Sequence, residues 1–394
     1  MTLRVVVLDH TAQPSGAELA LLRVVEAMDR GVQVHVVLFA PGPLVDRLRH
    51  AGATVEVVPL AARVGGRGRH ELGPGSPGGL LRSLLTLLAA VPFELRLARR
   101  LRRLRPDVVH ATSLKADLLG VLPAASARRP LVWHVHDRVA DDYLPAPVVR
   151  VLRRGARHLP AAVVANSDAT AATLPGARGL TVVRPGLAAA QVRAAPRPEP
   201  ADDVVGLVGR IGPTKGQLEL VRAAPAVLAA HPGTRFRFVG APLFGAEEYA
   251  RQVRSEVDRL GLADAVEWTG FVDDVAVELD ALTVCVHASP VPEPYGQVVA
   301  EALARGVPVV ATRAGGVPEI LERAGDDPVG VMVPPGDVEA LARAVVDVLT
   351  DREAAGRRAA AGHARAVAEL GVDRTVDGLV SVWRRVAGGR GSRP

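Results

Sequence analysis

The chain has 394 residues, 48% of them apolar, and contains no run of eighteen uncharged apolar residues. We therefore expect a soluble, globular protein with two domains of about 150 to 200 residues each. Its single cysteine, Cys285, excludes an intramolecular disulfide and is typical of a reducing compartment. The first ten residues read as a strand and not as a signal peptide, so we expect a cytoplasmic protein.

The net charge of +6 favours an anionic partner, such as a nucleoside diphosphate or an acidic membrane surface. Nucleic acid is not expected, because only 3% of residues are aromatic and no zinc spacing or RNA-binding signature is present. Lysine occurs only at Lys115 and Lys215. Because lysine is a compact point charge often used against phosphate, both are candidate phosphate contacts, although chance explains Lys115 equally well.

Short β-branched runs alternate along the chain with alanine- and leucine-rich helical stretches. This alternation predicts parallel sheets with helical crossovers. In the first half we expect strands at residues 4–8, 34–39, 54–58, 107–109, 131–135, 162–164 and 181–183. In the second half we expect them at residues 204–208, 235–239, 266–268, 284–286, 307–310 and 330–333.

A segment rich in alanine and proline, residues 188–202, lacks apolar periodicity and reads as an interdomain linker. We place the boundary near residue 192. The expected domains are residues 1–192 and 193–374, followed by a final helix within residues 375–390.

Residues 63–79 are rich in glycine and too long for a simple connector, so they predict a functional or disordered loop. The following residues, 80–104, predict an amphipathic helix with a leucine face and an arginine face. This helix could lie on an anionic membrane surface, which would make the protein peripheral to the inner membrane face. An ordinary crossover helix with a solvated basic face is the better-supported alternative.

A glycine-rich turn at residues 209–216, GRIGPTKG, follows one predicted strand and precedes a predicted helix. Glycine lets the backbone approach a ligand closely, and Arg210 and Lys215 bring two cations to the start of the helix. The pattern predicts an anion site. It is not a Walker loop, because its spacing differs and no serine or threonine follows the lysine. The alternative is a turn with exposed basic residues.

Two glutamates, Glu293 and Glu301, lie eight positions apart in the segment PEPYGQVVAE. The first falls in a proline-rich loop and the second on the helix that follows, so both carboxylates can face one site and bind vicinal hydroxyls. The intervening turn at residues 295–297 offers unpaired N–H groups at a helix start, where a diphosphate is favoured. A sugar nucleotide fits this pattern; a surface helix with two solvated glutamates is the alternative.

The whole segment 289–320, SPVPEPYGQVVAEALARGVPVVATRAGGVPEI, resembles the signature of the family 4 glycosyltransferases. The resemblance implies an α/β protein of the GT-B fold, with two doubly wound, Rossmann-like domains facing each other across a cleft. The first domain would bind the acceptor and the second the nucleotide sugar, and the last helix would return to the first domain. Such enzymes retain the anomeric configuration and generally use no divalent ion.

By this resemblance, Glu293 lies beside the transferred sugar, Glu301 binds the ribose, and Arg210 and Lys215 hold the diphosphate. The base would lie near residues 268–272. The donor-binding residues that the resemblance implies are Gly209, Arg210, Lys215, Gly270, Glu293, Tyr295, Gly296, Gln297, Glu301, Gly315 and Gly316.

In the first domain, family members carry a glycine pair where this chain has Ser15 and Gly16, which puts in doubt any contact that needs the first glycine. The segment LVWHVHD resembles the family segment whose histidine reaches the donor sugar, so His136 joins Glu293, Arg210 and Lys215 as a catalytic candidate. His134 is expected to be structural. The acceptor-side or phosphate-loop candidates are Ser15, Gly16, His110 and Lys115.

We therefore expect a retaining glycosyltransferase that uses a nucleoside diphosphate sugar, with a glycan, a lipid-linked intermediate or a small metabolite as acceptor. Neither a cofactor nor a metal is expected, because the acidic pairs at residues 141–142 and 273–274 lack the carboxylate cluster that a hard cation needs. A nucleotide-sugar epimerase of the same fold and a noncatalytic, partner-binding GT-B protein are the rival hypotheses.

Overall fold

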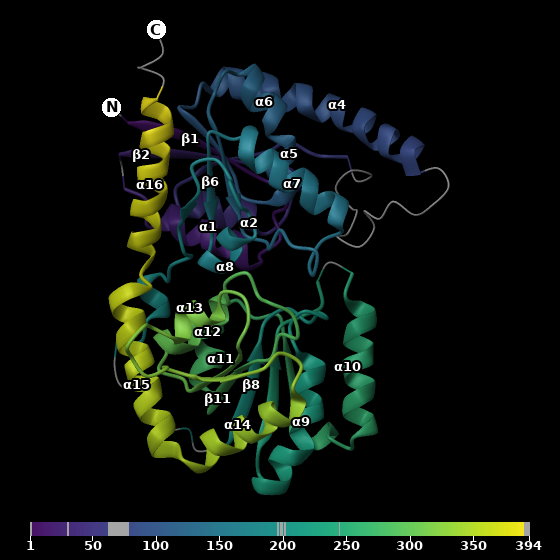
Figure 1. Cartoon of the computed structure of the whole chain (residues 1–394), viewed down its shortest axis with the longest axis vertical. Coiled ribbons are helices and arrows are strands. Elements are labelled where there is room, and N and C mark those ends of the chain that lie inside the picture. Colours follow the sequence, from purple (N-terminus) through teal and green to yellow (C-terminus); the bar gives the residue numbers. More distant parts are fainter. Residues whose placement is uncertain are drawn as a thin grey trace. The chain divides into compact units, whose positions relative to one another are not determined.

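The computed structural model describes residues 2–29, 31–61, 79–194, 197, 200, 202–243 and 245–389, with the backbone alone for residues 79–88. The chain forms two compact units (Figure 1). One consists of Met1–Gly186 and Val372–Pro394, and the other of Leu187–Gly371.

The first unit contains a seven-stranded parallel sheet in the order β3-β2-β1-β4-β5-β6-β7. Its strands are β1 (Leu3–Asp9), β2 (Val32–Leu38), β3 (Thr54–Val57), β4 (Val108–Ala111), β5 (Leu131–Val135), β6 (Ala162–Ala165) and β7 (Thr181–Val182). The strand order reverses between β1 and β4. Ligands of doubly wound sheets bind at the carboxyl ends of the strands beside such a point.

Helices cover both faces of this sheet (Figure 1). They are α1 (Gly16–Glu26), α2 (Leu44–His50), α4 (Gly79–Leu104), α5 (Leu114–Leu119), α6 (Val121–Ser126), α7 (Ala146–His158), α8 (Asp168–Ala172) and α16 (Val372–Gly388). Val5 and Val7 of β1 pack with α1, α2 and α16, whereas Val6 and Leu8 pack on the other face with α4 and α7. Both faces of the sheet are covered here, which explains why residues 5–8 of β1 form a continuous apolar run.

The final helix, α16, belongs to the first unit. Val376, Leu379, Val382 and Trp383 are buried in the same apolar cluster as Leu21 of α1. The threonine in its first turn, Thr375, donates a hydrogen bond from Oγ1 to the carbonyl oxygen of Arg184 at 2.9 Å.

The second unit has a six-stranded parallel sheet in the order β10-β9-β8-β11-β12-β13. Its strands are β8 (Val204–Val208), β9 (Arg235–Val239), β10 (Val266–Gly270), β11 (Val284–His287), β12 (Val309–Thr312) and β13 (Val331–Val333). Its helices are α9 (Gln217–Ala230), α10 (Glu247–Arg259), α11 (Val275–Asp280), α12 (Gln297–Ala304), α13 (Val317–Leu321), α14 (Val338–Thr350) and α15 (Arg352–Glu369). The order reverses between β8 and β11, which marks the carboxyl ends of these strands as the expected ligand site.

The predicted fold class is confirmed, and each predicted strand corresponds to one of the thirteen described above. Strand ends differ by up to two residues. The strand predicted at 307–310 begins at Val309, because Val307 donates its N–H to the carbonyl oxygen of Ala302 at the end of α12 and so still belongs to the helix terminus.

The segment predicted as a linker is tied to the second unit by specific contacts. Arg193 Nη1 lies 2.9 Å from Asp280 Oδ2, and Arg193 N donates to the carbonyl oxygen of Ala304 at 3.0 Å. Composition alone does not reveal such pairwise contacts. The glycine-rich stretch predicted as a loop falls almost entirely on residues 62–78, outside the described part of the chain.

The predicted basic helix is present as α4, where Leu97 and Leu101 are fully buried. Part of its arginine face contacts the protein itself, since Arg96 Nη2 donates to the carbonyl oxygen of Pro59 at 2.9 Å and Arg100 pairs with Glu56. Membrane contact through this helix stays a prediction. Within the described residues, each helix is too short or too polar to cross a bilayer.

Gly206 offers a test of packing in the second sheet. A Cβ atom at this position would lie 2.3 Å from Leu282 Cδ2, so Gly206→Ala should lower the free energy of unfolding by about 1–3 kcal/mol. Leu282→Ala should cost about 2–5 kcal/mol. The double variant should lose less than the sum, because the new methyl group fills part of the cavity. Urea denaturation of the four proteins checks this, and strictly additive losses would contradict it.

Candidate active site

The glycine-rich turn after β8 packs so closely on its neighbours that no side chain fits at its end. Gly216 caps α9 with φ 83°, and a Cβ atom there would lie 2.1 Å from the carbonyl oxygen of Ala288. Glycine tolerates this left-handed conformation. The turn therefore runs directly into the N-terminus of α9, where backbone N–H groups and the helix dipole favour an anion.

A buried glutamine, Gln217, fixes the shape of this turn. Its Nε2 donates to the carbonyl oxygen of Arg210 at 3.0 Å, and its Oε1 accepts from Gly212 N at 3.4 Å. Both ends of the amide are thus used inside the loop, which holds Arg210 at the start of the turn. Sequence reasoning missed Gln217, because a glutamine at a helix start carries no distinctive pattern.

Lys215 and Glu293, which are 78 residues apart in the sequence, form an ion pair. Lys215 Nζ lies 2.7 Å from Glu293 Oε1, and the side chains are only 24% and 17% exposed. On its other side, Glu293 Oε2 lies 3.7 Å from Nε2 of His287, whose Nδ1 is 3.3 Å from Thr312 Oγ1. The two predicted motifs therefore meet in one place.

Burial raises the pKa of Glu293, but the charge of Lys215 and the neighbouring His287 ring outweigh it, so the pKa lies well below its usual range. At neutral pH the Glu293 carboxylate is ionised and acts purely as a hydrogen-bond acceptor, as binding of sugar hydroxyls requires. Sequence reasoning missed His287. Its signal was present, since it ends a predicted parallel strand just as the first-domain histidines do.

A second glycine-containing turn, which carries Gly315 and Gly316, packs against the loop that carries Glu293. Gly316 N donates to the carbonyl oxygen of Glu293 at 2.9 Å, and Gly315 forms a β-bridge to Glu293 with φ 65°. A Cβ atom at Gly315 would lie 1.9 Å from that same oxygen. Gly315 and Gly316 were predicted as donor-binding residues, which stays a prediction; in the structure they contact the backbone of Glu293.

The helix α12 starts at Gln297 after Gly296, which has φ 101°. Its Glu301 accepts a hydrogen bond at Oε1 from Gln191 Nε2 at 3.1 Å. Tyr295 is buried in the apolar cluster of this unit, so of its predicted donor contacts only those of the backbone fit this structure.

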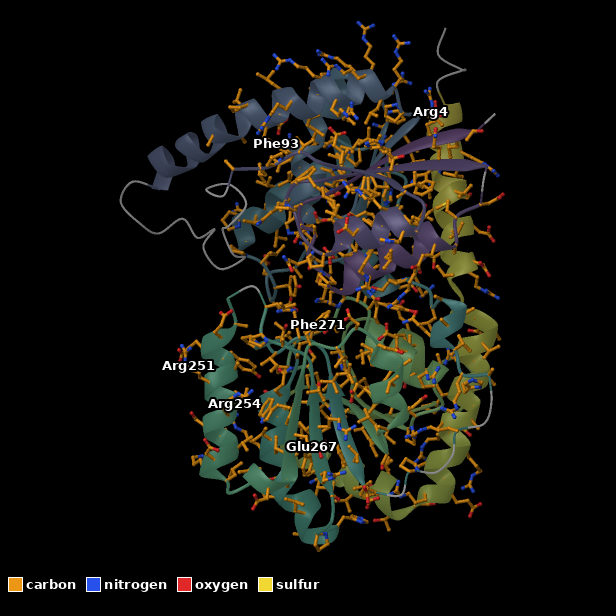
Figure 2. All side chains as sticks on the ribbon, turned by 180° about the vertical axis from the view of Figure 1, so that it is seen from behind. Arg4, Phe93, Arg251, Arg254, Glu267 and Phe271 are labelled. Atoms are coloured by element: carbon orange, nitrogen blue, oxygen red, sulfur yellow. The ribbon has the colours of Figure 1, made fainter. Side chains whose placement is uncertain are left out.

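The segment predicted to lie near the base, residues 268–272, begins with a tryptophan that packs against an aromatic ring and a guanidinium group. Trp268 stacks on Phe238 with ring centroids 4.7 Å apart, and the guanidinium of Arg254 lies 4.5 Å from the Trp268 ring. Gly270 ends the strand with φ 73°, and the Phe271 side chain that follows is 51% exposed (Figure 2). Phe271 is thus a flat apolar surface at the carboxyl end of β10.

In the first unit, His136 directly follows β5. Its carbonyl oxygen accepts from Asn166 Nδ2 at 3.2 Å, and the neighbouring Asp137 accepts from Tyr143 Oη at 2.9 Å. Burial lowers the pKa of His136 to about 4, against the opposing charges of Asp137 and Asp9. The imidazole is therefore neutral at neutral pH, and one ring nitrogen can donate a hydrogen bond while the other accepts.

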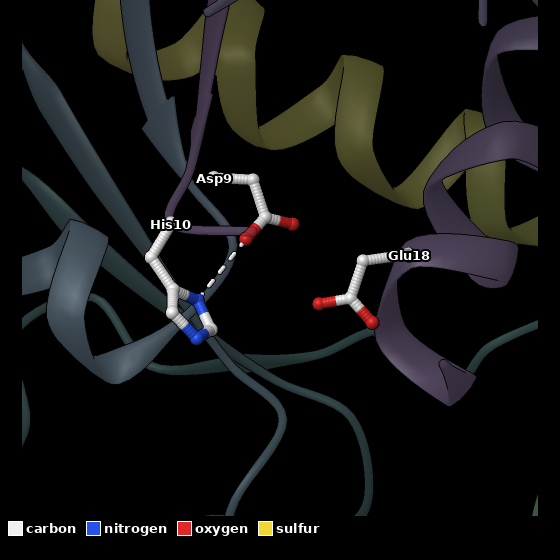
Figure 3. Close-up of side chains that lie close together, drawn as sticks. All are labelled: Asp9, His10 and Glu18. Carbon is white, nitrogen blue, oxygen red and sulfur yellow. Dashed lines mark ion pairs between the residues drawn. The ribbon is translucent and has the colours of Figure 1, made fainter. Parts of the chain in front are cut away.

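Asp9, His10 and Glu18 gather at the carboxyl end of β1 (Figure 3). One ligand-type atom from each lies within 4.8 Å of the others, a grouping that could hold a metal ion. Hydrogen bonds to other residues also hold these carboxyl groups in place. Asp9 Oδ2 accepts from Thr112 Oγ1 at 2.9 Å, and the Ser15 hydroxyl donates to Glu18. Burial and the charge of Asp9 raise the pKa of Glu18 to about 8.

Two aspartates, Asp9 and Asp137, raise the pKa values of two buried carboxyl groups at this end of the sheet. Asp117 of α5 is fully buried, and burial together with the charges of Asp137 and Asp9 raises its pKa well above the usual range. Glu18 also responds to the charges of Asp9 and Asp137. Sequence reasoning missed Asp9 and Asp117, although an aspartate at the end of a predicted strand was a usable signal.

The remaining first-unit candidates occupy different environments. Ser15 is the N-cap residue of α1, and Gly16 is the first residue of that helix. Lys115 lies half-buried in the first turn of α5. His110 lies inside β4, is only 2% exposed, and lines a small cavity of the first unit together with His136.

Comparison with known proteins agrees with this geometry. Residues 14–188 match the model of Glycosyltransferase Family 4, and residues 202–351 match that of Glycosyl transferases group 1. A 2-deoxystreptamine N-acetyl-D-glucosaminyltransferase of Streptomyces fradiae is 31% identical, across 96% of this chain and 94% of that protein. A D-inositol 3-phosphate glycosyltransferase of Kribbella flavida is 32% identical, across 66% of this chain and 67% of its own length.

Among solved structures, Anabaena Alr3699/HepE in complex with UDP and glucose superimposes with a TM-score of 0.82 at 27% identity, covering 97% of this chain and 100% of that one. Two doubly wound sheets of this kind, together with these relatives, define a GT-B enzyme of the nucleotide-sugar-dependent class. The chain belongs to family 4 of the glycosyltransferases, a family of retaining enzymes. The predicted family and reaction class are thus confirmed, which sets aside the epimerase and the noncatalytic protein.

Replacing Lys215 tests the electrostatics of the pair. In Lys215→Met the pKa of Glu293 should rise, because burial then lacks its largest counterweight, and the free energy of unfolding at pH 7 should fall by about 1–3 kcal/mol. In the parent protein the depressed pKa stabilises the fold above the unfolded glutamate pKa of about 4.3, and this stabilisation is lost as the pH falls through the folded value.

A ¹³C NMR titration of the glutamate carboxyl groups, with Glu293→Gln to assign the signal, measures the shift directly. Thermal unfolding between pH 3 and pH 7 measures its contribution to stability. An unchanged Glu293 titration in Lys215→Met would show that the contact does not control the carboxylate.

Proposed function

We propose that this enzyme transfers a hexosyl group, with retention, from a UDP-sugar to a small cyclitol acceptor that carries amino groups. The observation that carries the proposal is the 2.7 Å contact between Lys215 Nζ and Glu293 Oε1, which joins the phosphate turn to the glutamate loop. An ammonium group has three donors, so Lys215 can hold Glu293 and still contact a diphosphate. We also propose a cytoplasmic location, which the single free cysteine, Cys285, supports.

In the proposed reaction, the bond between the anomeric carbon and the diphosphate oxygen breaks while the acceptor oxygen bonds to the same face of the sugar. The departing phosphate oxygen takes the proton of the acceptor hydroxyl, and the nucleoside diphosphate leaves. Arg210 and Lys215 stabilise the negative charge that grows on this oxygen, and Glu293 fixes the sugar through its hydroxyls. The neutral His136 is proposed to donate a hydrogen bond to the donor sugar.

The choice of uridine as the base rests on a structural relative. HepE of Anabaena was crystallised with UDP and glucose and also with UDP-glucose. The exposed Phe271 ring beside Gly270 offers this chain a flat surface near the expected base position.

The choice of acceptor rests on two relatives and on charge. Both relatives are named for substituted cyclohexanes: 2-deoxystreptamine carries amines, and D-inositol 3-phosphate carries a phosphate. At the carboxyl ends of the strands in the first unit, the charges of Asp9 and Asp137 raise the pKa values of Glu18 and Asp117. Carboxylates attract an ammonium group and repel a phosphate, so the charge of this region favours the amino acceptor.

Substitution of the ion pair tests the catalytic assignment. Lys215→Ala and Glu293→Ala should each lower kcat with UDP-sugar by about 100-fold or more while the fold is kept, since each removes charge aimed at the reacting centre. The control is Arg222→Ala, an exposed basic residue of α9 that pairs with Glu256 at 3.1 Å. Transfer at the parent rate by either active-site variant would refute the assignment.

Proton linkage tests the acceptor. A bound ammonium group favours the ionised form of Glu18, whose pKa is raised to about 8, so binding below this pH should release protons and affinity should rise as the pH approaches 8. Calorimetry with 2-deoxystreptamine in buffers of different ionisation enthalpy counts the protons. Glu18→Gln should release fewer. Tighter binding of inositol phosphate than of 2-deoxystreptamine would overturn the proposed acceptor class and leave the transferase assignment intact.

A further inference from the structure

Three histidines lie close together on neighbouring strands of the first sheet, and a tryptophan of α16 joins them. Trp383 Nε1 lies 3.1 Å from His110 Nδ1, and His110 Nε2 lies 3.2 Å from His134 Nδ1. The His134 ring then lies against that of His136, with ring centroids 4.0 Å apart. All four side chains also line one small cavity of the first unit.

The direction of these hydrogen bonds is fixed at one end. An indole N–H can only donate, so Nδ1 of His110 must accept and, in a neutral ring, Nε2 must carry the proton. His110 Nε2–H then donates to His134 Nδ1, which places the proton of His134 on its own Nε2. One donor on α16 therefore determines the tautomers of two imidazoles on β4 and β5.

Burial keeps these rings neutral, which the directional argument requires. It lowers the pKa of His110 to about 3 and that of His134 well below its usual value. Trp383 is only 1% exposed, so water does not compete for its indole N–H. Burial thus protects both the donor and the chain of acceptors behind it.

We propose that Trp383, His110 and His134 form a directional hydrogen-bond relay that holds His134 as the Nε2–H tautomer and thereby positions the His136 ring for the transfer reaction. Trp383 and His110 are positioning residues in this scheme. This inference rests on the proposed role of His136, but the tautomers themselves do not depend on it.

The environment of His134 Nε2 explains why the tautomer of His134 matters for His136. His134 Nε2 is buried and has no hydrogen-bond partner among the described residues. With a proton on Nε2, His134 presents a hydrogen-bond donor to its surroundings. Without that proton, Nε2 would present an acceptor. Because the rings of His134 and His136 are in contact, exchange of the two tautomers alters the electrostatic environment in which His136 is held.

Two substitutions of His110 separate hydrogen bonding from packing. In His110→Gln, the amide oxygen can accept from Trp383 while the amide NH₂ donates to His134, so the direction of the relay is kept. In His110→Leu, a side chain of similar bulk does neither. Trp383→Phe is a third variant that keeps an aromatic ring and removes the first donor.

The primary readout is the tautomer of His134, measured by long-range ¹H–¹⁵N correlation on ¹⁵N-histidine-labelled protein, with the signal assigned by its loss in His134→Gln. The parent and His110→Gln should show protonated Nε2 in His134, whereas His110→Leu and Trp383→Phe should show mixed tautomers. In transfer assays, kcat of His110→Leu should fall about tenfold with little change in KM for the donor, and His110→Gln should stay close to the parent.

A control for packing is Leu379→Ala, which removes buried volume from α16 beside the same cavity without touching the relay. It should lower thermal stability and leave the tautomer unchanged. Retention of protonated Nε2 in His110→Leu, or equal loss of kcat in the folded His110→Gln and His110→Leu variants, overturns the relay. Full activity of His136→Ala would instead refute the proposed role of His136, with the tautomer result unaffected.

Discussion

The ion pair between Lys215 and Glu293 is the constraint on which the second unit's site depends. Burial of a carboxylate is unfavourable unless a partner compensates for it, and here Lys215 and His287 outweigh that cost and keep Glu293 ionised. The pair also fixes two loops relative to each other, each of which begins at the carboxyl end of a different strand. The ionised Glu293 side chain thus also makes the structural contact between the glutamate loop and the glycine-rich turn that carries Lys215.

The parallel sheet makes this meeting possible. β8 and β11 are adjacent at the point where strand order reverses, so the turns that follow them emerge side by side. Glycine then allows contacts that other residues would block: Gly216 packs on the carbonyl of Ala288, and Gly315 packs on that of Glu293. Gly216 is the N-cap residue of α9, and a helix start favours an anion. Because the chain belongs to family 4 of the glycosyltransferases, the reaction expected at this arrangement is sugar transfer.

In the first unit, burial favours the neutral forms of several ionisable groups, which is the opposite of the result at Glu293. Where the second unit stabilises a charge, the first suppresses several: Glu18 and Asp117 have raised pKa values, and the three histidines have lowered ones. Neutral groups in an apolar setting have defined donors and acceptors, which suits directional hydrogen bonding. Carboxyl groups held close together also respond strongly to an arriving cation. Both properties follow from the burial of polar residues between the sheet and the helices that cover it.

The sequence alone determined the thirteen strands, the fold class and the family, because β-branched alternation and glycine-rich turns are local patterns. Lys215 and Glu293 were both identified in this way, whereas their contact was not. Only the tertiary structure decided which side chains meet: His287 against Glu293, Gln217 inside the phosphate turn, Arg193 on Asp280, and Trp383 on His110. These contacts join residues far apart in the chain, and their energies depend on burial and distance, which no local pattern encodes.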